Sequence, residues 1–199
     1  MSAVLDVDAL PVEQRQRRER LVRTAVTFLA EQEYERIQVK DVASAAQVAL
    51  GTLYRYFSSK DHLFAAALQA WSKGFGGHVA ERPPQGTAAE RVKFVFRRAA
   101  RAFERQPQVY GVLLALRAST DPQARALVGA FNQQLTEAFG VVLARQASSR
   151  RAGVVSVMSA VLDANLREWH FGHQSMEAVY AAIDEAADLM LRPSQGPRR

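Results

Sequence analysis

The chain contains no cysteine among its 199 residues. This absence excludes disulfide bonds, thiol catalysis and cysteine-ligated zinc, and it suits the reducing cytosol. The chain also lacks any apolar run approaching the roughly 18 residues that a membrane helix needs. Its first residues carry acidic side chains before basic ones, which is the reverse of a secretory signal peptide. We therefore expect a cytoplasmic protein with no membrane partner.

Proline is scarce and unevenly distributed, and its positions indicate where long helices can form. A proline removes a backbone N–H donor and breaks a helix interior, so helices are expected between the prolines. The seven prolines lie at positions 11, 83, 84, 107, 122, 193 and 197. Long helices therefore fit within 12–82, 85–106, 108–121 and 123–192, and 81–90 is expected to link two of them.

Apolar residues recur at helical spacing over most of the chain. One stripe contains Val92, Phe96, Ala99 and Phe103, which share one face of a 3.6-residue helix. Comparable stripes follow through the rest of the sequence. Only YERIQV (34–39) has a strand-like pattern, and it is too short to build a sheet. With 48% hydrophobic residues the chain can bury a core, and the expected fold class is all-α.

The net charge of +6 and the pI near 10.0 suggest an anionic partner, such as nucleic acid. The distribution of this charge weakens the suggestion. Residues 14–60 carry 9 Lys and Arg against 5 Asp and Glu, whereas 61–199 carry 17 against 12. Most of the excess therefore lies outside the segment that carries the DNA-binding pattern described next.

Residues 38–60 predict a helix-turn-helix. A short helix is expected over 38–46 and a second over 50–57, with Leu53 and Phe57 turned toward the core. Ser58 or Ser59 is then expected to cap a long helix by accepting a bond from a free backbone N–H. Two short helices joined by a tight turn and packed on a longer helix form this motif.

The second short helix leaves several side chains off its apolar stripe, and we call them the reading head. Hydroxyl-bearing and cationic side chains can touch base edges and phosphate oxygens, and small ones let the backbone approach. The reading head consists of Leu50, Gly51, Thr52, Tyr54, Arg55 and Tyr56. Lys60, in the first turn of the next helix, and Lys40, in the first short helix, are further candidates for phosphate contact. The alternative is an ordinary surface helix, and Arg55 fits a solvated charge as well as a DNA contact.

At these residues the chain resembles the TetR family of bacterial transcriptional repressors. The segment VKDVASAAQVALGTLYRYFSSKDHLFAAAL (39–68) carries the resemblance, and GTLYRYFSSKDHL is its most diagnostic part. Two positions depart from the family pattern: Gln47 replaces the usual glycine of the turn, and Ala49 replaces the usual serine cap. A non-glycine residue in a left-handed turn costs about 1 kcal/mol. The departures weaken the turn without changing the expected motif.

The resemblance implies a DNA-binding domain followed by a helical domain that binds an effector and forms a homodimer. We expect an N-terminal tail over 1–13, the DNA-binding domain over 14–60, the effector and dimerisation domain over 61–192 and a C-terminal tail over 193–199. The expected partners are a double-stranded DNA operator, a small-molecule effector and a second copy of the chain.

A weaker likeness points to the subgroup that represses steroid and lipid catabolism in actinobacteria. It rests on VALGTLYRYFSSKDHL and on the spacing of RAFERQPQVYGVLLAL (101–116) before the final helices. This subgroup responds to acyl-CoA thioesters, so a small apolar or acyl effector is expected, with acyl-CoA among the candidates. The candidate pocket residues, most of which could equally be plain core, are Phe96, Phe103, Tyr110, Leu114, Phe131, Leu135, Met158, Leu162, Asn165 and Trp169.

The basic segment 82–105 allows two interpretations. Arg97, Arg101 and Arg105 share one helix face, which could hold a phosphate-bearing ligand or could simply be solvated. The alanine-rich helices expected over 154–191 similarly suit either a dimer interface or internal packing. Dimerisation is favoured because a single helix-turn-helix reads too few base pairs to be specific.

No enzyme signature, cofactor motif or metal-ligand set is recognisable in the sequence. His170 and His173 form HxxH without a companion ligand, and no frame such as GxSxG places a nucleophile. We therefore predict a ligand-responsive transcriptional repressor that is not an enzyme and needs no cofactor. The alternatives are a multidrug-sensing or constitutive DNA-binding factor with no physiological effector and, remotely, a helical enzyme.

Overall fold

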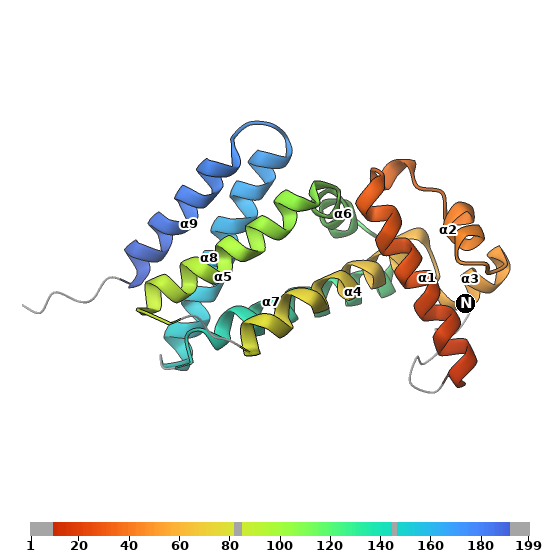
Figure 1. Ribbon diagram of the computed structural model, residues 1–199, viewed down its shortest axis with the longest axis horizontal. Helices are drawn as coiled ribbons and strands as arrows, with labels where there is room; N and C mark the ends of the chain where they lie inside the picture. Colours follow the sequence, from red (N-terminus) through yellow and green to blue (C-terminus); the bar gives the residue numbers. More distant parts are fainter. Residues whose placement is uncertain (1–9, 82–84, 145–146, 192–199) are drawn as a thin grey trace, which may run out of the picture. The chain divides into compact units, whose positions relative to one another are not determined.

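The computed structural model describes residues 10–81, 85–144 and 147–191, and this part of the chain forms α-helices and one 3₁₀ turn, with no strand (Figure 1). This confirms the all-α prediction. The strand-like interpretation of 34–39 was wrong, because Tyr34–Arg36 forms the 3₁₀ turn η1 and buries Ile37 just after it. None of the described helices is long and apolar enough to cross a membrane.

The described residues divide into two compact units, and two helices contribute to both. One unit takes the residues up to Gly74 together with Gln106–Asn132, and the other takes Phe75–Arg105 with the residues from Gln133 onward. The helices α4 (Lys60–Glu81) and α7 (Pro122–Val141) cross these boundaries. We call the two units the reading unit and the distal unit.

The reading unit contains the helix-turn-helix. Its helices are α1 (Val12–Glu31), α2 (Val39–Ala45), α3 (Leu50–Tyr56), the first part of α4, α6 (Pro107–Arg117) and the first part of α7. Helices α1, α2 and α3 pack on one another (Figure 1). Their shared core includes Leu21, Ala25, Val42, Ala43 and Leu53, each at most 2% exposed. The helix pair is therefore held rigidly on α1.

The structure describes the end of the expected N-terminal tail but not the expected C-terminal tail. Val12 and Glu13, placed in the N-terminal tail by the sequence analysis, belong to α1, and Leu10 just before them is buried. The C-terminal tail over 193–199 lies outside the described residues.

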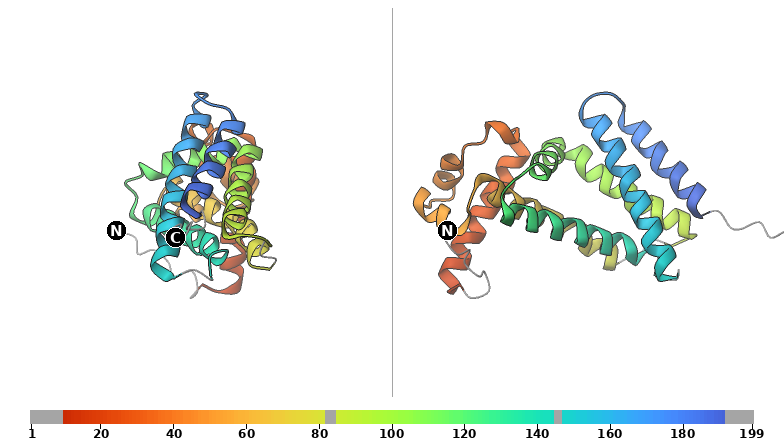
Figure 2. Two further views of the ribbon diagram at one scale, coloured as in Figure 1. Left: turned by 90° about the vertical axis from the view of Figure 1, so that its left-hand side faces the viewer. Right: turned by 180° about the vertical axis from the view of Figure 1, so that it is seen from behind.

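The distal unit is built on α5 (Ala88–Arg105), α8 (Ser148–His170) and α9 (Met176–Leu191). The three helices lie side by side in the views of Figures 1 and 2, with α8 and α9 joined by a short turn. The stripe predicted from Val92 to Phe103 faces inward, and Phe96 packs on Phe139 of α7 with ring centroids 4.2 Å apart. Thr87 and Glu90 form a capping box at the start of α5.

Candidate nucleic-acid interface

The turn between α2 and α3 has the geometry that the sequence led us to expect. Gln47 has φ +55°, in the left-handed region that glycine favours. The N–H of Gln47 bonds to Ser44 O and that of Val48 to Ala43 O, each at 2.9 Å, which is the Schellman ending of a helix. The turn forms despite the missing glycine, because its backbone bonds and the buried Val48 hold it.

Ala49 stands at the N-cap of α3 and gives that helix no side-chain cap. The family's usual serine would accept a bond from a free N–H there. The first turn of α3 thus keeps backbone N–H groups available on the side where the reading head begins.

Most of the reading head is open to solvent. Leu50 and Tyr54 are 41% and 50% exposed, and Gly51 and Arg55 are also exposed, whereas Thr52 is half-buried. Tyr56 differs, because it is only 7% exposed. The expectation that Tyr56 lies off the core stripe was therefore wrong: Tyr56 is the last residue of α3 and is buried, as Leu53 is.

The ammonium group of Lys60 is hydrogen-bonded within the reading unit. It donates to Tyr34 O and, at 3.5 Å, to Glu35 O, and lies 4.3 Å from the centroid of the Tyr34 ring. Burial lowers the pKa of Lys60, with the nearby carboxylates of Glu35 and Asp61 opposing it. A phosphate contact by Lys60 stays a prediction, and it would require the ammonium to leave or share these carbonyl oxygens.

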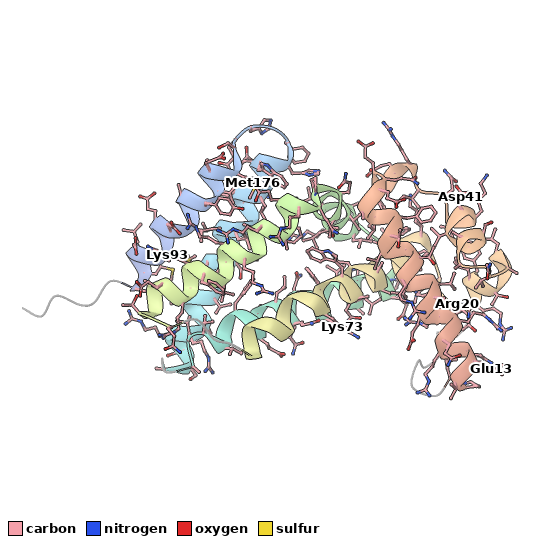
Figure 3. The ribbon with its side chains drawn as sticks, in the orientation of Figure 1. Glu13, Arg20, Asp41, Lys73, Lys93 and Met176 are labelled. Carbon is pink, nitrogen blue, oxygen red and sulfur yellow. The ribbon has the colours of Figure 1, made fainter. Side chains whose placement is uncertain are left out.

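Two other cations near the motif behave differently from each other. Lys40, on α2, is exposed, so its predicted phosphate contact remains sterically open. Arg18, on α1, instead lies over the Phe57 ring at 5.0 Å. Burial lowers the pKa of Arg18. Arg18 thus helps to hold the end of α3, a role that the sequence pattern did not reveal. Figure 3 shows the side chains of these helices, with Arg20 labelled on α1 and Asp41 on α2.

The candidate pocket residues are divided between the two units. Tyr110, Leu114 and Phe131 belong to the reading unit, and the other seven belong to the distal unit. Most of the ten are buried, whereas Leu114, Leu135, Asn165 and Trp169 are half-buried. Their role in holding an effector remains a prediction.

Asn165 has partners within the protein. Its side-chain N–H group donates to Val161 O at 2.8 Å, and Gln174 donates to both Asn165 O and Asn165 Oδ1. Asn165 and Gln174 therefore join the end of α8 to the segment that leads into α9.

The distal unit also contains a groove that the sequence analysis missed. It has a volume of about 480 Å³ and lies between the end of α7 and the start of α8. It is lined by Thr136, Glu137, Gly140, Val141, Ala144, Ser148, Arg151, Ala152 and Val155. None of the ten candidate pocket residues lines it, and no sequence motif marks it, because its small and polar residues are typical of any helix surface.

The basic face of α5 is largely paired with α9. Lys93 lies 2.7 Å from Asp188, and Arg97 lies 3.2 Å from Asp184. Arg97 and Arg101 also lie over the ring of Tyr180. Figure 3 labels Lys93 on α5 and Met176 at the start of α9. Arg97 is thus engaged in a contact between helices, whereas Arg101 and Arg105 are exposed, as expected for a solvated face.

The His–Phe turn between α8 and α9 forms no metal centre. His173 Nδ1 lies 3.0 Å from Glu168, and His170 packs edge-on against Phe171. Within the described ranges, no three His, Asp or Glu side chains are grouped as a metal ion would require.

Comparisons with known proteins agree with this geometry. Residues 21–67 match the family model "Bacterial regulatory proteins, tetR family", and residues 86–190 match the model "Tetracyclin repressor-like, C-terminal domain". The HTH-type transcriptional repressor KstR of Rhodococcus jostii is 28% identical over 187 residues, covering 94% of this chain and 87% of that protein.

Solved structures show the same fold. A TetR transcriptional regulator from Rhodococcus sp. RHA1 has a TM-score of 0.78 at 24% identity, covering 92% of this chain and all of that one. FadR from Bacillus subtilis, solved in complex with stearoyl-CoA, has a TM-score of 0.67 at 18% identity, covering 87% and 97%. Because the two family models together span both the helix-turn-helix and the C-terminal helices, the chain belongs to the TetR family and is a helix-turn-helix transcriptional repressor rather than an enzyme.

Proposed function

We propose that the chain is a homodimeric repressor that binds a palindromic operator and is released by a small apolar or acyl effector. The observation that carries this proposal is the exposed reading head on α3, whose opposite side is buried against α1 and α2. The major groove of B-DNA admits one α-helix, and the exposed Tyr54 and Arg55 can reach phosphates or base edges there. Such a repressor acts in the cytoplasm, where the chromosome lies.

The outer faces of α8 and α9 support the dimer. Val157 on α8 and Leu189 on α9 are 46% and 61% exposed. Among the alanines of these two helices, Ala160, Ala178 and Ala181 are also exposed, whereas Ala187 is buried within the unit. Two copies of these helices would bury the apolar surface in a four-helix interface and place two reading heads on successive half-sites.

The proposed effector chemistry rests on relatives. FadR was solved with stearoyl-CoA, and KstR is named a repressor. We therefore propose an apolar or acyl effector, with acyl-CoA thioesters as the first candidates. Effector and operator binding would oppose each other reciprocally, because each would favour a different arrangement of the dimer.

A gel-shift titration tests the proposal, with the DNA directly upstream of the gene as probe and unrelated DNA as competitor. We expect specific binding and release by stearoyl-CoA or a related thioester, but not by CoA alone. Binding that persists across a broad panel of thioesters and apolar compounds would favour the constitutive factor. Failure to bind any DNA at low salt would contradict both functions.

The reading head is tested by Arg55→Ala, with Arg36→Ala as the matched control. Arg36 is likewise an exposed arginine, on η1, 3.0 Å from Glu33 and outside α3. We expect Arg55→Ala to weaken operator binding by about 1–3 kcal/mol, as for a lost base or phosphate contact, while Arg36→Ala changes it little. Equal affinity in both variants would remove Arg55 from the interface.

A further inference from the structure

The segment formed by the turn after α3 and the first turn of α4 exchanges hydrogen bonds in both directions with the turn that precedes α7. From this segment, Ser58 Oγ and Ser59 Oγ donate to Asp121 Oδ2 at 2.7 and 2.6 Å. From the turn before α7, Ser119 Oγ donates to Asp61. We call these five residues, Ser58, Ser59, Asp61, Ser119 and Asp121, the turn clasp. All five lie in the reading unit.

The Asp121 carboxylate serves two helix N-termini at once. Its Oδ1 accepts bonds from the N–H groups of Gln123 at 2.8 Å and Ala124 at 3.2 Å, which caps α7. Its Oδ2 accepts from Ser59, whose Oγ also accepts from His62 N at 3.0 Å and so caps α4. The positive ends of both helices thus share one anion.

The hydrogen bonds keep this carboxylate ionised. Partial burial alone would raise the pKa of Asp121, but the bonds from Ser59, Ser58, Ala124 and Gln123 outweigh it and lower the pKa to about 2. Hydrogen bonds to a charged acceptor are roughly twice as strong as those between neutral groups. At neutral pH the clasp is therefore a charged link.

The other carboxylate ties the clasp to the DNA-binding helices. Asp61 accepts from Tyr34 Oη as well as from Ser119, and Tyr34 lies in η1, between α1 and α2. Ser58 directly follows Phe57, the C-cap residue of α3. A movement of the clasp would therefore act on both ends of the helix-turn-helix.

The clasp joins the first turns of α4 and α7, the two helices that run from the reading unit into the distal unit. We propose that the turn clasp is the joint through which the distal unit sets the position of the reading head, and that Ser58, Asp61, Ser119 and Asp121 are positioning residues for operator binding. This inference rests on the proposed function. A change in the distal unit that alters the spacing of α4 and α7 reaches α3 through these bonds.

The double variant Ser58→Ala with Ser119→Ala isolates the joint from ordinary helix capping. It removes one bond between the turns in each direction, together with the contact of Ser58 Oγ with His62 Nδ1 and the bond from Asp121 N to Ser119 Oγ. It leaves Ser59 on α4 and Asp121 on α7 as caps. The backbone N–H of Ser58 keeps its bond to His62 Nδ1. Thr87→Ala, which removes a cap from α5 in the distal unit, is the matched control.

Amide hydrogen exchange of the full-length protein, with and without the DNA from directly upstream of its gene, measures the coupling without an effector. In the unaltered protein, DNA bound at the reading head should slow exchange in α5 and α9 as well as in α3. In the double variant DNA should still slow exchange in α3. The slowing in α5 and α9 should fall about five-fold, which is the lower end of the effects that coupling between two sites produces. The Thr87→Ala variant should retain the slowing in α5 and α9.

The outcomes separate the inference from the proposed function. If the unaltered protein binds no DNA, both fall together. If it binds DNA and the double variant shows the same slowing in α5 and α9, the clasp is a structural cap only and the inference is overturned. Should the double variant fail to fold, Asp121→Asn, which keeps the Oδ1 cap of α7 but removes the charge, gives the same two readings.

Discussion

At the residue scale, the turn of the DNA-binding motif shows how a local rule can be broken without losing the structure. Gln47 occupies a left-handed conformation at φ +55° that glycine would adopt without a steric penalty. Its side chain is exposed, so no packing compensates for the strain. The two Schellman hydrogen bonds around it are intact. The free-energy cost of this strain is therefore offset by the hydrogen bonds and packing of the rest of the motif.

This strain gives a prediction for Gln47→Gly. We expect the substitution to raise the free energy of unfolding by about 0.5–1 kcal/mol, because the relieved strain exceeds the extra entropy of the unfolded chain. Gln32→Gly is the control, since Gln32 is exposed and extended, with φ −138°. Urea unfolding should show a higher midpoint for Gln47→Gly and a lower one for Gln32→Gly. A lower midpoint in both would mean that the turn carries no strain.

At the scale of elements, the helices themselves could be predicted from the sequence, but their partners could not. The 3.6-residue spacing from Val92 to Phe103 is a local property and placed the buried face of α5 correctly. The pairing of Lys93 with Asp188 depends on how α5 meets α9, which no local pattern encodes. Ser58 or Ser59 was likewise expected to cap α4, and Ser59 does so, but its bond to Asp121, 62 positions away, was not foreseen.

The α5–α9 contact has an imperfect ion pair, which gives the second prediction. Arg97 lies 3.2 Å from Asp184 through one nitrogen only, and Arg97 Nε and Asp184 Oδ1 are buried with no hydrogen-bond partner among the described residues. Each side chain is about a third exposed, so solvent weakens the pair. The pair should therefore add little stability beyond what an apolar pair of similar size would give.

The double-mutant cycle of Arg97→Met and Asp184→Leu tests this expectation. Asp184→Leu alone should cost about 1 kcal/mol, because Arg97 then has a half-buried charge without its partner, and adding Arg97→Met should recover most of the loss. Thermal or urea unfolding measures all four proteins. The same cycle on Lys93 and Asp188, where the ammonium contacts both carboxylate oxygens at 2.7 Å, is the comparison. A coupling larger at Arg97 than at Lys93 would contradict the expectation.

At the scale of the whole molecule, the proposed homodimer would bring two reading heads to one operator. A single reading head contacts one half-site, and linking two heads in a dimer raises the affinity by about 10²- to 10⁴-fold without any new contact to DNA. The clasp and the dimer interface would then act on the same quantity, the spacing of two reading heads. A variant whose dimer is less stable should therefore bind the operator more weakly.

Introducing a charge into the exposed apolar surface of α8 and α9 tests this link. Val157→Glu combined with Leu189→Glu should give a folded monomer, because a dimer would have to bury two unpaired carboxylates from each chain and would lose the apolar contacts there. Sedimentation measures the mass, and gel shift should show operator affinity reduced by about 10²-fold or more. The control is Phe94→Glu, since Phe94 is an apolar residue on α5 that is 47% exposed. It should leave the mass and the operator affinity unchanged. A dimer that survives the double substitution with full operator affinity would place the interface elsewhere on the molecule.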